Sequence, residues 1–497
     1  MTTIKTGRRL LLKGAFGAAL ATWIPQRAFA QPAIRMRVEW QQFKLTSQYG
    51  SFRAAIAAMR ANTNPLSRGS LQYWANVHVN QCPHGAPYFI AWHRGYLYYF
   101  EQQLRIASGD PTLNLPYWDY FSYATMPAEF TDPAPGNPLY LQRPGANVRS
   151  ALDLAPFAAT VFNFQHGTAN AFEPKIEDIH NPVHDLIGGV MSTMQSPLDP
   201  IFYLHHASID RLTHAWALPD GKGIPYSSNP YSAADSAPYW AGKHVYAANL
   251  TMQRYLTLDP SWLGVDYANT SMPTTLPPLA SLSAQREGAA ASPVLARPPL
   301  RSFTTLPARR ISASRRALAG VGEPTFDEQS TSILLRLDKQ DAAEVARVVS
   351  LRRAAGESGV QRSRGAIKVR FDRTQIAGTA GQGGFFYALY LNMPAQVDSP
   401  LERERSFIGT VGAFQIAAAS HHGAAVLEFD VSNLLARQRR ADFSELTLSW
   451  VRVNGDQSPA GTTIEVEELR LDLAFEAQPA PAPPLPKPPG FYRRRPA

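Results

Sequence analysis

WANVHVNQCPHGAPYFIAWHRGYLYYFE, residues 74–101, and IHNPVHDLIGGVMSTMQSPLDPIFYLHHASIDR, residues 179–211, hold seven of the twelve histidines of this chain. Each stretch offers three histidines that could converge on one metal ion: His78, His84 and His93 in the first, and His180, His184 and His206 in the second. Imidazole suits copper and zinc, whereas carboxylate-rich sets suit iron, manganese or magnesium. The two stretches therefore predict a paired metal site, and copper is the favoured metal.

The first stretch contains the pattern of a helix that carries a ligand near its beginning. The periodic positions follow i, i+4, i+7 and i+11 and are occupied by His93, Leu97, Phe100 and Leu104. We expect Glu101 and Arg105 to lie on the wetter side of this helix, and Gly109 to end it.

The second stretch predicts two further helices. His180 and His184 are four residues apart and share a helix face, but Asn181 stands where a zinc protease would need a glutamate. Asp199 and Pro200 are typical of a helix start. The helix that follows carries the doublet His205 and His206, whose side chains diverge by about 100°, so only one of them is expected to bind metal. Asp210 follows His206 by four residues, and we expect it either to orient the ligands and their neighbours or to form a buried salt bridge with Arg211 or another base.

The patterning changes along the 497 residues, and this predicts a multidomain α + β chain. Residues 31–269 read as a helical bundle around a polar centre. Residues 270–326 are rich in Pro, Ser, Ala and Arg without steady periodicity and predict a linker or a long covering loop. Residues 327–476 alternate with a period of two, as in Ile367, Val369 and Phe371, and predict an all-β sandwich or barrel. Residues 477–497 form a Pro-rich basic tail.

The N-terminus predicts export rather than membrane anchoring. Arg8 and Arg9 precede an apolar run at 14–23 and the small-residue site 28–30, as in a twin-arginine signal peptide that spans residues 1–30. That run is shorter than the roughly twenty residues that span a bilayer. We expect a periplasmic or secreted protein with no membrane span.

The formal charge of +9 does not indicate nucleic-acid binding, because the arginines cluster in the leader, the linker and the tail. Cys82 is the one cysteine, so an intrachain disulfide is impossible.

The motifs taken together resemble one family. They are Cys82-Pro83-His84, Trp92-His93-Arg94, His180-Asn181-Pro182-Val183-His184 and Asp199-Pro200-x-Phe202-x-x-His205-His206-x-x-x-Asp210. Residues 60–268 resemble the type-3 copper proteins, which are tyrosinases, catechol oxidases and molluscan haemocyanins. The gap of six residues from His78 to His84 is shorter than in the fungal and plant enzymes, and no histidine precedes His78.

The resemblance implies the roles of particular residues. It implies two copper ions, O2 as co-substrate, His206 as the third ligand of the second copper and His205 in its outer shell. It also implies a thioether between Cys82 and His84, and a water-holding pair, Glu177 and Asn181, that deprotonates a monophenol. Glu173 is the alternative base. The stretch with Met191, Thr193 and Met194 is expected either to line the entrance or to fill the core.

The function expected from the resemblance is oxidation of small phenols: ortho-hydroxylation of monophenols and oxidation of o-diphenols to o-quinones. A catechol oxidase without monophenolase activity, an oxygen carrier of the haemocyanin type and a dizinc hydrolase are the alternatives. The C-terminal part resembles the sandwich domain of plant polyphenol oxidases, so we expect a latent enzyme whose site is covered. The other histidines fit no ligand position and are predicted to be structural or surface residues: His166, His214, His244, His421 and His422.

Overall fold

The computed structural model describes residues 34–168, 170–218, 237–278, 295–355, 365–397, 399–420, 423–438 and 440–475. The predicted leader, the predicted basic tail, His421 and His422 lie outside these residues, so export by the twin-arginine route stays a prediction. Within the described ranges, no helix is both long and apolar enough to cross a membrane.

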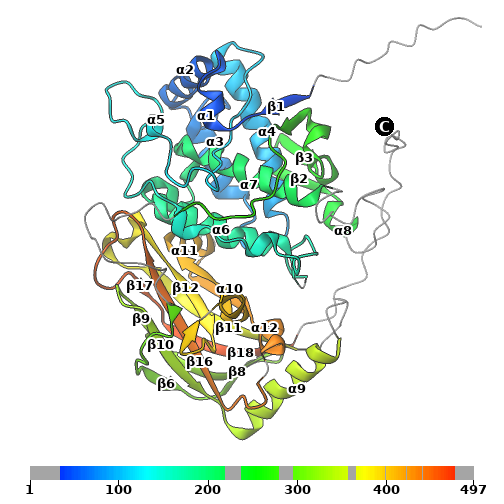
Figure 1. The fold of residues 1–497 in the computed structure, drawn as a ribbon, viewed down its shortest axis with the longest axis vertical. Coiled ribbons are helices and arrows are strands. Elements are labelled where there is room, and N and C mark those ends of the chain that lie inside the picture. The colour runs from blue at the N-terminus through cyan, green and yellow to red at the C-terminus, as the bar shows by residue number, and fades with distance from the viewer. Residues whose placement is uncertain are drawn as a thin grey trace, which may run out of the picture. The chain divides into compact units, whose positions relative to one another are not determined.

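Helices dominate the first half of the described chain (Figure 1). They are α1 (Trp40–Phe43), α2 (Gln48–Ala61), α3 (Leu71–Gln81), α4 (Phe89–Ser108), α5 (Ala128–Thr131), α6 (Phe172–Ile187), α7 (Ile201–Ala217) and α8 (Ala237–Trp240). Two small sheets accompany them: the parallel pair β1 (Arg35–Arg37) and β4 (Val265–Tyr267), and the antiparallel pair β2 (Lys243–Ala247) and β3 (Leu250–Gln253).

The predicted ligand-bearing helix is α4. Its periodic residues Leu97, Phe100 and Leu104 are fully buried, and Gly109 ends it with a φ of 70°, a conformation that glycine adopts without strain. The prediction for Glu101 is wrong. Glu101 is fully buried and bonds to Arg37 at 2.5 Å, so a partner far away in the sequence places this acid in the core.

Helix α7 is buried over almost its whole length, which marks it as the central helix of the bundle. It begins next to the predicted start: Asp199 Oδ1 accepts a hydrogen bond from the Ile201 N–H at 3.1 Å. Asp199 is in turn held by Arg143 at 2.6 Å. The doublet His205–His206 therefore enters the core one turn after a firmly anchored helix end.

The second half is mainly β-structure. Its strands are β5 (Leu295–Ala296), β6 (Thr304–Leu306), β7 (Arg309–Ser312), β8 (Arg315–Gly322), β9 (Thr325–Phe326), β10 (Thr331–Arg336), β11 (Ala366–Ile376), β12 (Phe385–Leu391), β13 (Gln396–Val397), β14 (Phe407–Gly412), β15 (Ala425–Asp430), β16 (Glu445–Asn454), β17 (Ile464–Glu465) and β18 (Glu468–Ala474). The helices among them are α9 (Lys339–Ala355), α10 (Pro400–Ser406), α11 (Ala413–Ser420) and α12 (Ser432–Arg437).

Two antiparallel sheets enclose one apolar core. The smaller has the order β10-β16-β12-β14, and the larger has the order β6-β8-β18-β11-β17-β9, with β15 on β11 and β7 on β8. Ile367, Val369 and Phe371 of β11 point into the core shared by both sheets, as their alternation predicts. The α + β class with a sandwich-like C-terminal part is therefore confirmed. The predicted linker is partly wrong, because residues 304–326 form β6 to β9 and β8 pairs along its length with β18.

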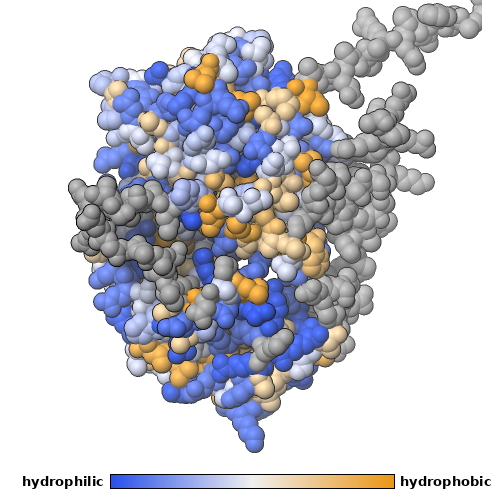
Figure 2. Space-filling view, viewed as in Figure 1, coloured by the Kyte–Doolittle hydropathy of each residue, from blue (hydrophilic) through white to orange (hydrophobic). Residues whose placement is uncertain are grey.

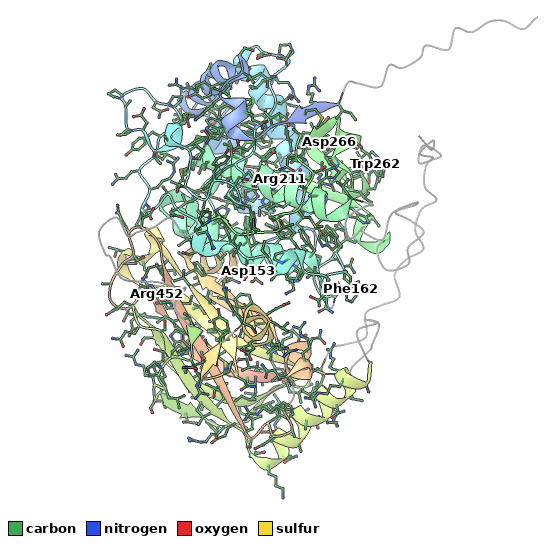
Figure 3. All side chains as sticks on the ribbon, viewed as in Figure 1. Asp153, Phe162, Arg211, Trp262, Asp266 and Arg452 are labelled. Carbon is green, nitrogen blue, oxygen red and sulfur yellow. The ribbon has the colours of Figure 1, made fainter. Side chains whose placement is uncertain are left out.

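The sandwich packs on the helical part through β14 and α11, which lie against α6. Asp456 adds a second attachment, since its Oδ2 accepts the N–H groups of Ala146 and Asn147 at 2.7 and 3.1 Å. Asp153, labelled in Figure 3, lies 3.6 Å from Arg403 of α10 across the same boundary. On the face shown in Figure 2, hydrophilic residues cover most of both parts and hydrophobic residues are scattered among them.

Candidate metal centre

Three imidazole nitrogens of the second stretch converge on one point. Nε2 of His180 lies 3.1 Å from Nε2 of His184 and 3.2 Å from that of His206, and the third side of the triangle is 3.4 Å. A triangle with sides of about 3.2 Å has its corners about 1.9 Å from its centre, close to the ~2.0 Å of a metal–imidazole bond. The three nitrogens therefore fit one metal ion.

The opposite ring nitrogens of four histidines fix which atom faces the ion. Their partners at 2.8 to 2.9 Å are oxygens: Met194 O for His78, Phe89 O for His93, the Asn181 amide for His180 and Met191 O for His184. A hydrogen bond from Nδ1 to an oxygen leaves the Nε2 lone pair free to bind metal, which is the usual support of a histidine ligand. Met191 and Met194 thus act through their backbone oxygens, which side-chain patterns do not reveal.

The first stretch forms a second, looser group. Potential ligand atoms of His78, Cys82, His84 and His93 all lie within 4.8 Å of one another. Cys82 Sγ lies 3.5 Å from Nε2 of His84 and equally far from Nε2 of His93. The Nε2 atom of His78 is buried, and among the described atoms it has no hydrogen-bond partner. Three imidazoles again fit one metal ion, with a thiol beside them.

The two groups face each other. The rings of His93 and His206 stack at 4.1 Å with an angle of 21°, and His84 and His180 lie 6.1 Å apart between ring centroids. Helices α3 and α4 supply the first group with two of its histidines, and α6 and α7 supply all of the second. Six imidazoles from two distant segments therefore meet in one buried cage that fits two copper ions.

Burial keeps these imidazoles neutral. It lowers the pKa of His78 to about 4 and that of His180 to about 3. It also holds the pKa values of His84, His93, His184 and His206 well below the ordinary value, with the neighbouring imidazoles adding to the effect. Only neutral imidazole binds metal, so the cage is ready to receive ions near neutral pH.

The two residues expected in the outer shell differ in their contacts. His205 stacks on His180 at 5.0 Å and 19°, while His206 is the member of the doublet that closes the nitrogen triangle. Asp210 contacts no ligand ring. Its carboxylate binds Arg94 at 2.6 Å and the Tyr267 hydroxyl at 2.5 Å. The salt-bridge alternative is the one observed, and the base is Arg94, the neighbour of His93 in the sequence.

A residue from the sandwich covers the cage. Phe414, in the first turn of α11, stacks its ring on His184 at 3.9 Å and 14°, and lies 5.2 Å from His84. Its N–H donates to Asp185 Oδ1 at 2.8 Å. Nothing in the local sequence around Phe414 marks it as part of a metal site, because it lies 230 residues beyond His184 and belongs to the other half of the fold.

The expected base, Glu177, lies on α6 one turn before His180. It is 6 % exposed, its Oε2 lies 3.6 Å from Nε2 of His166, and its Oε1 has no hydrogen-bond partner among the described atoms. The amide oxygen of Asn181 accepts a hydrogen bond from Nδ1 of His180. Glu173, the alternative base, already has hydrogen-bond partners. Its carboxylate accepts hydrogen bonds from the Tyr239 hydroxyl and from the backbone N–H groups of His166 and Ile90.

The comparisons with known proteins agree with this geometry. The family model for the common central domain of tyrosinase matches residues 54–151 and 140–218. A tyrosinase of Streptomyces glaucescens is 31% identical over 194 residues, which cover 30% of this chain and 69% of that protein. A tyrosinase of a Hahella species is 32% identical over 186 residues, 29% of this chain and 40% of that protein. The solved structure of a latent aurone synthase (polyphenol oxidase) covers 90% of this chain and 91% of its own at 18% identity and a TM-score of 0.49.

The residues that the family model matches contain both histidine groups. The chain continues beyond the residues that the family model matches, through the sandwich that carries Phe414. From the cage and the sequence matches together, it follows that this chain belongs to the tyrosinase family of type-3 copper proteins.

Proposed function

We propose that the cage binds two copper ions and that the protein uses O2 to oxidise small phenols. The first ion is held by His78, His84 and His93, and the second by His180, His184 and His206. The reactions are ortho-hydroxylation of monophenols and oxidation of o-diphenols to o-quinones. The copper pair supplies the redox chemistry with O2, and the protein supplies binding, orientation and proton removal.

The observation that carries the proposal is the place of Phe414. Its six-membered ring lies flat against His184 and covers that side of the cage. When this ring leaves, the space it vacates has the size and shape of a monocyclic phenol and keeps the same stacking surface. A phenol in that space would lie against a ligand of the second copper, with Glu177 on the same helix as that ligand.

Proton removal falls to Glu177. Burial raises the pKa of its carboxyl group, which makes it a better proton acceptor once it is ionised, and one of its oxygens is free of other partners among the described atoms. The Asn181 amide oxygen accepts a hydrogen bond from Nδ1 of His180 and so orients that ring. Replacement of Glu177 by Gln should slow phenol oxidation without loss of bound copper.

The proposal is tested by loading the full chain with copper and following O2 uptake with tyrosine and with a catechol. We expect two copper ions per chain and quinone formation, and we expect His84→Ala and His206→Ala to abolish both. Zinc in place of copper, with no oxidation of either substrate, would instead identify a dizinc hydrolase. Oxidation of the catechol alone would assign a catechol oxidase.

An oxygen carrier is the second candidate, and the covering ring is the observation that favours it. With Phe414 against His184, a carrier would need an opening wide enough only for O2, whereas an oxidase would need one wide enough for a phenol. Reversible O2 binding by the intact chain, with no quinone formed even after Phe414 is truncated, would establish the carrier. Quinone formation after truncation would establish a latent oxidase.

We also propose the thioether between Cys82 and His84. The two residues are in contact, with Sγ 3.5 Å from Nε2 of His84. The bond would hold the imidazole in one orientation and remove a thiol, whose pKa is raised by burial and by the Glu177 carboxylate. Formation of the bond breaks the S–H bond of Cys82 and a ring C–H bond of His84 and needs a two-electron oxidant, which O2 supplies in the copper-loaded chain. Intact mass of the chain treated with copper and O2 should then fall by two hydrogens, and the denatured protein should fail to react with a thiol reagent.

A further inference from the structure

His166 lies where it can take up a proton from the buried acid Glu177. It sits in the loop between Asn163 and Ala171, which folds back over the start of α6: the Phe172 N–H donates to Asn163 O at 2.9 Å. The side chain of His166 is 29% exposed and that of Glu177 is 8% exposed, with Nε2 and Oε2 separated by 3.6 Å. One imidazole therefore touches both the buried carboxylate and solvent.

Glu173 holds this arrangement in place. Its Oε2 accepts the backbone N–H of His166 at 2.9 Å, and its Oε1 accepts the Tyr239 hydroxyl at 2.8 Å and the N–H of Ile90, in the first turn of α4, at 3.4 Å. Because Glu173 and Glu177 are four residues apart, they share one face of α6. Glu173 therefore holds the backbone of His166, and Glu177 contacts the His166 ring.

We propose that His166 is the outlet through which the proton removed from a phenol by Glu177 reaches solvent. This inference rests on the proposed function. The phenolic O–H bond breaks and its proton binds Oε1 of Glu177; the His166–Glu177 pair then releases one proton from the His166 ring to water and returns to its starting charge. His166 does not touch the reacting atoms, so it acts as a positioning and proton-transfer residue.

The charges around the pair support this role. Burial lowers the pKa of His166, but the hydrogen bond and charge of Glu177, with further contributions from Glu173 and Asp178, outweigh burial and raise it. Burial raises the pKa of Glu177, which His166 and the Gly85 N–H oppose. Both pKa values are therefore raised: a raised pKa makes the Glu177 carboxylate a better acceptor for the phenolic proton, and it lets the His166 ring carry a proton near neutral pH.

The test uses two substrates of different acidity, catechol and 4-nitrocatechol, because one hydroxyl of the latter is already ionised near neutral pH and its first proton needs no base. Phe414→Ala is introduced into the copper-loaded full chain so that both substrates reach the cage. His166→Gln, which can donate a hydrogen bond but cannot carry a proton, is compared with His214→Asn. His214 forms a similar pair with Asp266, at 3.2 Å, away from the cage; Asp266 is labelled in Figure 3.

We expect His166→Gln to lower kcat/KM for catechol about tenfold or more, and to leave kcat/KM for 4-nitrocatechol and the copper content unchanged. Glu177→Gln should show the same selectivity, and the double variant should be no slower than Glu177→Gln alone. His214→Asn should affect neither substrate. If His166→Gln does not fold, His166→Asn, which is too short to reach Glu177, serves in its place.

An equal loss for both substrates in His166→Gln, or no loss for either, would overturn the outlet while leaving the oxidase intact. Absence of turnover in the parent protein with an open cage is a different result, because it refutes the proposed function itself.

Discussion

Truncation of Phe414 should convert a covered enzyme into an active one. Phe414 is fully buried and its ring lies 3.9 Å from that of His184. Exposing such a ring costs about 1.5–3 kcal/mol, and each ~1.4 kcal/mol is a factor of ten in a population or a rate. If the ring must leave before a phenol enters, Phe414→Ala should raise kcat/KM of the intact chain for catechol by roughly 10- to 150-fold.

The assay measures quinone formation per bound copper in the full chain. The matched control is Ile416→Ala: Ile416 lies on the same helix and is buried, but it belongs to the apolar core of the sandwich. The control should lose stability without gaining activity. Equal rates in the parent, Phe414→Ala and Ile416→Ala would refute the covering role, and an equal rise in both variants would assign the effect to general loosening of α11.

Three further substitutions test other parts of the structure. Asp210→Asn leaves Arg94 buried without its charge partner, so the free energy of unfolding in urea should fall by about 3–5 kcal/mol, and copper affinity should fall about 10–100-fold. Gly412→Ala would place a methyl group inside the carboxylate of Asp185, so it should displace β14 and α11 and raise catechol oxidation as Phe414→Ala does. Glu173 has a pKa raised by burial to about 7, so its stabilising effect is full below its ordinary pKa of 4.5 and is lost as pH rises through 7. The metal-free Glu173→Gln variant should therefore gain about 3 kcal/mol of unfolding free energy relative to the parent between about pH 4 and about pH 8, and an unchanged difference would refute the raised pKa.

The ligand-bearing helices could be predicted because their determinants are local. Spacing of four residues places His180 and His184 on one face, and the period of α4 places His93 at its start. The β-strands of the C-terminal part were equally visible as alternation, as in β11. The arginine-rich segment before residue 327 has no local strand pattern, and the structure differs from the prediction there because β8 is held by pairing with β18, about 150 residues away.

Partners distant in sequence account for what was missed. Glu101 looks like a surface acid until Arg37, which lies on β1, is brought against it. His166 looks like a loop residue until the loop folds over α6 and sets its ring beside Glu177. Phe414 has no local signal at all, since its role depends on how the sandwich docks on the helices.

Contacts between residues distant in the sequence also help to decide whether the protein is an oxidase or an oxygen carrier. Six neutral imidazoles, five of them on buried residues, would hold two copper ions in either protein, so the cage does not separate the two functions. Access to the cage and removal of a proton do separate them, because a carrier needs only O2 to enter, whereas an oxidase must admit a ring and take its proton. Phe414 shows that a ring fits against His184, and Glu177 with His166 offers a path for the proton. A carrier has no use for such a path, so the buried acid joined to a solvent-exposed imidazole favours the oxidase.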